Sequence, residues 1–95
     1  MIAIKTPLFP LGQIVATPGA IEALETAKSS AWQLLSRHVG GDFGEVDQDD
    51  WQANIEAIQD GTRILSAYTL TTDERLWVIT EADRSSTCIL RPDEY

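Results

Sequence analysis

Residues 63–90 read RILSAYTLTTDERLWVITEADRSSTCIL, and this stretch decides the fold. Side chains at 64–70 alternate with a period of two, which is the period of a strand rather than of a helix. Residues 75–80 and 87–90 are rich in β-branched and aromatic types, and polar four-residue segments with turn composition separate the three runs. The stretch therefore predicts three consecutive antiparallel strands.

Three helix signals precede these strands. Each has a side chain able to accept a hydrogen bond from the first turn, followed by apolar residues at helical spacing. Glycine follows the second and third of these segments, where a helix commonly ends. The expected helices run from Thr17–Pro18 to about Ala27, from Ser29–Ser30 to Gly40–Gly41, and from Asp47 or Asp49 to Asp60–Gly61.

Helices followed by a meander predict an α+β fold, with two to three helices packed on one face of a small antiparallel β-meander. Before the helices, the prolines at 7 and 10 favour an extended entry, and residues 13–16 form a short β-like run. A chain of 95 residues has room for one core, so we expect a single domain over residues 1–95. The apolar faces predict that Leu35, Trp51, Ile55, Ile58 and Trp77 are mostly buried.

The charge of the chain restricts its partners. Fifteen acidic and seven basic residues give a formal net charge of −8, and the basic residues are scattered. Such a chain repels a phosphate backbone, so we expect no direct nucleic-acid binding and favour a protein partner with a basic surface. Solubility alone is the alternative reason for an acidic composition.

Compartment and assembly follow from a few further features. Cys88 is the single cysteine, which excludes an intramolecular disulfide and indicates a reducing compartment. Residues 1–7 lack a basic segment followed by a sustained apolar stretch, and no apolar run approaches the length of a membrane span. We expect a cytoplasmic protein that does not contact a membrane, and a homodimer would add stability to so small a domain.

An acidic run between the second and third expected helices is the first candidate site. It contains no basic residue, and its carboxylates can either dock a basic partner or form a solvated loop that caps the third helix. A calcium loop beginning at Asp47 is excluded, because Gln52 and Ile58 stand where glycine and glutamate are needed. We therefore expect no metal site, and no phosphate-loop spacing of glycines predicts a cofactor. The candidate partner-binding residues are Asp42, Glu45, Asp47, Asp49 and Asp50.

A second candidate site surrounds the only histidine, His38. Its neighbour Arg37 and the charged turn at 81–84 offer groups for acid–base chemistry or ligand binding. The structural alternatives are that the histidine packs in the core or interacts with a helix C-terminus, and that the turn holds local ion pairs. This set comprises His38, Arg37, Glu81, Asp83 and Arg84.

Three stretches carry a family resemblance. Residues 10–20, 37–44 and 76–85, which read PLGQIVATPGA, RHVGGDFG and LWVITEADRS, resemble a family of small bacterial proteins often labelled plasmid-related or hypothetical. The family has no established function, so the resemblance implies a bacterial, mobile-element setting and transfers no catalytic residue. Phe43 stands where many relatives carry tryptophan.

Two functions compete. The first is a non-enzymatic acidic protein-interaction module, a mobile-element accessory or inhibitor that docks on a basic host protein. The alternative is a small enzyme or ligand-binding domain that uses His38 with Asp42 or Glu45. Convergence of these side chains in a concave pocket favours the enzyme, and a convex acidic strip favours docking.

Overall fold

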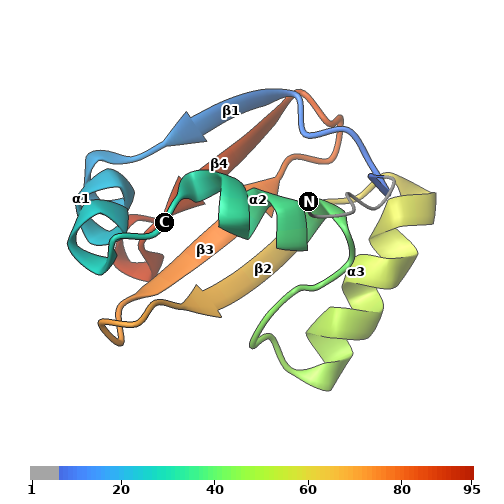
Figure 1. Cartoon of the computed structure of the whole chain (residues 1–95). Coiled ribbons are helices and arrows are strands. Elements are labelled where there is room, and N and C mark those ends of the chain that lie inside the picture. Colours follow the sequence, from blue (N-terminus) through green and yellow to red (C-terminus); the bar gives the residue numbers. More distant parts are fainter. Residues whose placement is uncertain (1–6) are drawn as a thin grey trace, which may run out of the picture.

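The computed structural model describes residues 7–95 and shows an α+β fold, as the sequence predicts. The first six residues, on which the search for a targeting signal rests, lie outside this range. Figure 1 shows a sheet with α2 lying across one of its faces. The elements in chain order are β1 (Gln13–Ala16), α1 (Pro18–Ala27), α2 (Ala31–Val39), α3 (Gln48–Asp60), β2 (Ile64–Thr69), β3 (Arg75–Thr80), β4 (Ser86–Leu90) and the short 3₁₀ helix η1 (Pro92–Glu94).

The four strands form one mixed sheet in the order β1-β4-β3-β2. The antiparallel meander β2-β3-β4 is confirmed, with Ala67 opposite Trp77 and Trp77 opposite Leu90. β1 joins parallel to β4, with Gln13 beside Ser86. The sheet is therefore larger than the predicted meander, because the β-like run near the N-terminus pairs with a strand near the C-terminus.

The predicted helix boundaries are confirmed, and local hydrogen bonds explain them. The Thr17 hydroxyl accepts from the Ala20 N–H at 3.1 Å, and Ser30 forms a reciprocal capping box with Gln33. The Asp47 carboxylate accepts from the Asp50 N–H at 2.8 Å. These side chains satisfy backbone donors that a helix start would otherwise leave without partners.

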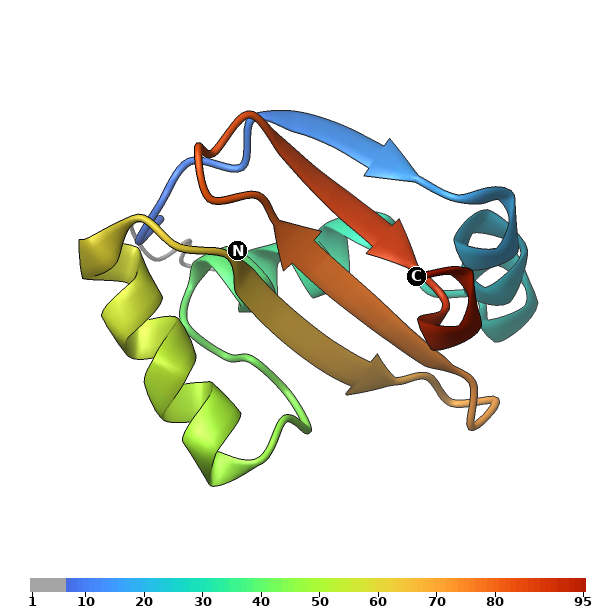
Figure 2. The ribbon, with the colours of Figure 1, turned by 180° about the vertical axis from the view of Figure 1, so that it is seen from behind.

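The main core lies between α1, α2 and one sheet face. Leu34 and Leu35 of α2 pack with Tyr68, Leu76 and neighbouring buried side chains of the strands. Figure 2 shows that α2 lies behind the sheet when the molecule is viewed from the other side, so the helices leave this second face uncovered. The C-terminal Tyr95 contacts that face, with its ring 5.8 Å from the ring of Trp77.

The predicted core is partly wrong. Leu35 is buried as expected, Trp51, Ile58 and Trp77 are half-buried, and Ile55 is 45% exposed. α3 packs at the edge of β2 and turns Asn54 and Ala57 inward. Because its contact face is centred on those two residues, Ile55 is left on the flank of the helix.

The outer edge of β2 is closed by two contacts that replace a neighbouring strand. The Asn54 side-chain amide donates to the Leu65 carbonyl at 2.7 Å and accepts from the Leu65 N–H at 3.1 Å. Two residues along, Ala67 forms an isolated parallel bridge with Gly44. An edge strand covered in this way offers few free groups for pairing with another chain.

Replacing Asn54 with alanine should lower the free energy of unfolding by about 1–3 kcal/mol. The change leaves the N–H and carbonyl of Leu65 without partners where α3 covers them. Gln52→Ala is the control, because Gln52 is exposed on the same helix. Urea denaturation followed by tryptophan fluorescence measures both variants, and equal midpoints would show that the Asn54 contacts contribute nothing.

Candidate functional site

His38 lies at the centre of a buried polar chain that connects helix and sheet. The residue is fully buried near the end of α2, with its ring against the edges of Phe9 and Phe43. Its Nδ1 lies 2.6 Å from the Ser66 hydroxyl on β2, and its Nε2 lies 2.9 Å from the Thr80 hydroxyl on β3. Both ring nitrogens are thus occupied by protein groups, and neither faces solvent.

The chain of hydroxyls fixes the tautomer of His38. The Thr87 hydroxyl donates to the Leu11 carbonyl at 2.7 Å, so it must accept from Thr80 in their own 2.7 Å contact. Thr80 has then used its only proton and must accept from His38 Nε2. The ring therefore carries its proton on Nε2, and Nδ1 accepts from the Ser66 hydroxyl.

This arrangement suits a neutral imidazole. Burial lowers the pKa of His38 to about 4, because the charged ring would lose its hydration. A catalytic base near neutral pH needs a pKa near that pH and access to a substrate. The surroundings of His38 provide neither, so its contacts are those of a core histidine.

Arg37 and Asp42 form an ion pair beside the buried chain. Arg37 Nε donates to Asp42 Oδ2 at 2.8 Å, and the guanidinium lies 4.5 Å from the centre of the Tyr68 ring. The hydrogen bond from Arg37 is the main cause of a lowered pKa for Asp42. The Tyr68 hydroxyl donates to the Asp42 carbonyl at 2.6 Å, and burial raises the pKa of this tyrosine to about 12. Asp42 therefore serves the loop structure and carries little unbalanced charge.

The negative charge of Glu45 is likewise balanced by an arginine. Its Oε1 accepts from the Thr69 hydroxyl at 2.7 Å and from Arg75 at 3.0 Å. These two hydrogen bonds, that of Thr69 first, lower the pKa of the carboxyl. Two of the five acids in the predicted run are thus paired with arginines that the sequence places elsewhere.

The charged turn at 81–84 holds the structure together and does not join His38 in a pocket. Arg84 donates to the carbonyls of Ala57 at 2.8 Å and Thr62 at 2.7 Å, which ties the turn to the C-terminal end of α3. Asp83 accepts from the Ser85 N–H at 3.0 Å, and hydrogen bonds from Ser85 lower its pKa. The second candidate set therefore does not converge.

The remaining acids of the predicted run gather on α3 with others that the prediction missed. Asp47 caps the helix, and Asp49 and Asp50 occupy its first turn. Asp49, Glu56 and Asp60 are all exposed at positions i, i+7 and i+11, which places them along one side of the helix. No ion pair among residues 7–95 involves these three side chains, which we call the acidic strip. The i, i+7, i+11 spacing of these acids is present in the sequence and is the signal that identifies the strip.

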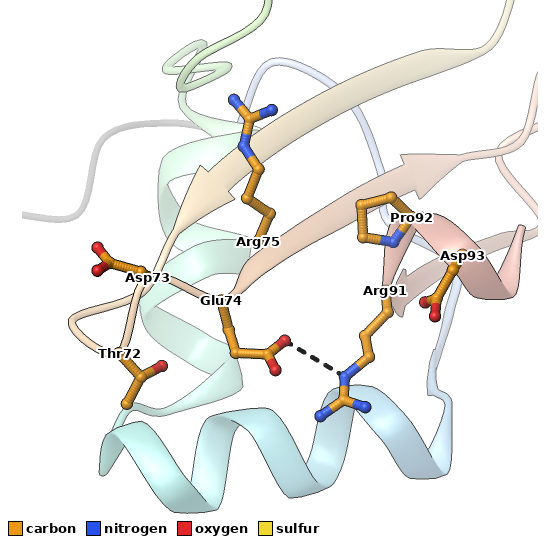
Figure 3. A pocket seen from close by; sticks show the side chains of 7 residues that line it. All are labelled: Thr72, Asp73, Glu74, Arg75, Arg91, Pro92 and Asp93. Atoms are coloured by element: carbon orange, nitrogen blue, oxygen red, sulfur yellow. Dashed lines mark ion pairs between the residues drawn. The ribbon is translucent and has the colours of Figure 1, made fainter.

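Two hollows of the described surface are large enough to admit a small ligand. Figure 3 shows the smaller, of about 430 Å³, between the β2–β3 turn and the segment after β4. Its two arginines are already paired, Arg91 with Glu74 at 3.4 Å and Arg75 with Glu45. The hollow therefore presents no free cationic group to a ligand.

The larger hollow runs along α2 and encloses about 860 Å³. Its lining includes Trp32, which is 57% exposed, together with Arg37 and Thr69. His38 does not line it. The groove has apolar surface and hydroxyl groups, and Asp42, the carboxylate among its lining residues, is already paired with Arg37.

The described part of the chain shows neither a cluster of metal-ligating side chains nor a membrane-spanning helix. Within residues 7–95, His, Cys, Asp and Glu side chains do not gather into a group of three that could hold a metal ion. In the same part of the chain, no helix has the length and apolar character needed to cross a membrane. No family model, no curated protein and no solved structure matches the chain.

Proposed function

We propose that this protein is a non-enzymatic interaction module that docks on a basic protein through the acidic strip of α3. The observation that carries the proposal is a convex, exposed helix face with three carboxylates and no basic residue anywhere from Gln48 to Asp60. Like charges on one side of a helix lower its stability, so we expect the three carboxylates to have a binding role that offsets this loss. Binding to a positively charged partner would be such a role, because the partner's charges would relieve the repulsion among the carboxylates.

The burial of His38 supports docking over the enzyme alternative. A general base must reach the proton that it removes, and His38 is enclosed with both nitrogens bonded. In the alternative set, Arg84 donates to backbone carbonyls, Asp83 accepts from the Ser85 N–H, and Arg37 is paired with Asp42. The partner is then a basic host protein that the module inhibits or assists, in line with the mobile-element setting that the resemblance implies.

Removing the strip charges should weaken binding without loss of the fold. The test variant is Asp49→Asn/Glu56→Gln/Asp60→Asn, which changes three charges and almost no volume. Asp49 lies near the positive end of the helix and Asp60 near the negative end, so their effects on stability oppose each other. We expect the association rate with the partner to fall about tenfold at low salt, with a weaker salt dependence.

A matched control separates the strip from net charge. Glu22→Gln/Glu25→Gln/Asp73→Asn also removes three exposed charges, and these side chains make no ion pair among residues 7–95. The partner is identified by affinity capture from the source cell with the native chain, and its association rates with the three proteins are then compared at about 50 and 200 mM salt. Equal losses in the two variants would leave only a general charge effect and would refute the strip as the docking site.

A further inference from the structure

Within residues 7–95, the outer edge of β1 is open, in contrast to the closed edge of β2. The N–H groups of Gln13 and Thr17 donate to β4, to the carbonyls of Ser85 at 2.9 Å and Ile89 at 3.0 Å. Because successive residues of a strand bond in opposite directions, the backbone groups of Ile14 and Ala16 point away from β4. Figures 1 and 2 both show β1 at the margin of the sheet, and no other element of residues 7–95 lies along its outer side.

The side chains of this edge are apolar and exposed. Ile14 is 48% exposed and Val15 is 46% exposed, and they project from opposite faces of the sheet. Residues 7–21 contain no charged side chain, although the whole chain has a net charge of −8. β1 carries no lysine, and no other element of residues 7–95 covers it, so its short length of four residues is its main protection against pairing.

We propose that β1 is the contact through which two copies of this chain pair. In an antiparallel arrangement centred on Val15, Ile14 of each copy lies opposite Ala16 of the other. The outward N–H and carbonyl groups of these residues then form two reciprocal pairs of hydrogen bonds, and the two Val15 side chains meet on one face. The two sheets become one continuous sheet across the two-fold axis.

The lack of charge around β1 makes it the segment at which a second copy would meet the least repulsion. Two molecules of net charge −8 repel each other, and the segment around β1 lets them approach without burying a charge. A strand of four residues makes a small contact, so the dimer is of the weak, exchanging class. β1 and α3 lie at opposite edges of the sheet, so pairing leaves both acidic strips free.

A cysteine cross-link tests the register. Val15→Cys is made with Cys88→Ser, because Cys88 lies beside Val15 in the sheet and would otherwise compete as a partner. In the proposed dimer the two Val15 Cα atoms are about 4.5 Å apart, within the range of a disulfide. Gln13→Cys with Cys88→Ser is the control, because the two Gln13 Cα atoms would be about 14 Å apart. We expect mild oxidation to cross-link the first variant about tenfold faster than the second.

A charge-pair experiment tests the same contact without oxidation. Val15→Lys and Val15→Glu should each sediment as monomers, since like charges would face each other, and an equimolar mixture should restore the dimer. Circular dichroism checks that each variant is folded. Equal cross-linking at the two positions, or a mixture that stays monomeric while the native chain dimerises, would overturn the proposal. A monomeric native chain at millimolar concentration would do the same. None of these results depends on binding by α3.

Discussion

Acidification from pH 7 to about 4 should lower the free energy of unfolding by about 3 kcal/mol through His38 alone. The folded-state pKa is about 4, because the ring is buried, against about 6.5 in the unfolded chain. Between these values the unfolded chain binds the extra proton. Stability is therefore complete above pH 6.5 and is lost as the pH falls toward 4.

The hydrogen-bond chain gives this effect its structural basis. A protonated ring would have to donate from both nitrogens, but Ser66 already directs its proton at Nδ1. Protonation in the folded state therefore places a charge on a ring that water cannot hydrate. It also disrupts the donor–acceptor sequence of the hydrogen bonds from Ser66 to Thr80. The pKa values of the Asp42 and Glu45 carboxyls are lowered from 3.8 and 4.5, so their stabilising contribution begins to be lost as the pH falls through those values and adds to the effect of His38 near pH 4.

Two measurements check the prediction. His38 is the only histidine, so its imidazole signals in an NMR titration need no assignment and should show a midpoint near 4. Urea denaturation between pH 4.5 and 7.5 should show rising stability in the native chain, and a flat profile in His38→Leu/Ser66→Ala/Thr80→Val. A midpoint near 6.5 would mean that the ring is hydrated in the folded state.

Gly44→Ala should lower the free energy of unfolding by about 2–5 kcal/mol. Gly44 has a φ of 73°, and a Cβ there would overlap the carbonyl oxygen of Ala67 and approach Tyr68 Cδ1 to 2.7 Å. Relief of the overlap would separate the loop from β2. The contacts of Phe43 and Glu45 with Ala67, at 3.1 and 2.7 Å, would be lost with it.

Gly61→Ala measures the conformational part of this effect without the steric overlap. Gly61 has nearly the same φ, 74°, at the C-cap of α3, but nothing lies within 4 Å of a Cβ placed there. Its substitution should cost only about 1–2 kcal/mol, the penalty of the left-handed conformation. Chemical denaturation compares the two, and equal losses would show that the approach of Gly44 to β2 adds nothing to its conformational cost.

The sequence by itself determined the local structure of this protein. The caps at Thr17, Ser30 and Asp47, the glycine at 61 and the alternation of residues 64–70 predicted the helices and the meander correctly. Each of these signals acts through residues within a few positions of one another. Their physical cause, a capped backbone group or a side-chain period, is therefore present in the sequence itself.

Only the tertiary structure decided the candidate sites. Asp42 looks free in the sequence until Arg37 folds onto it, and Glu45 until β3 brings Arg75 beside it. His38 looks like a possible base until Ser66 and Thr80 enclose it. Arg37 and Asp42 are close in the chain, but the pairing of Glu45 with Arg75, the burial of His38 and the parallel pairing of β1 with β4 depend on residues far apart in it. Local propensity carries no information about which of these will meet.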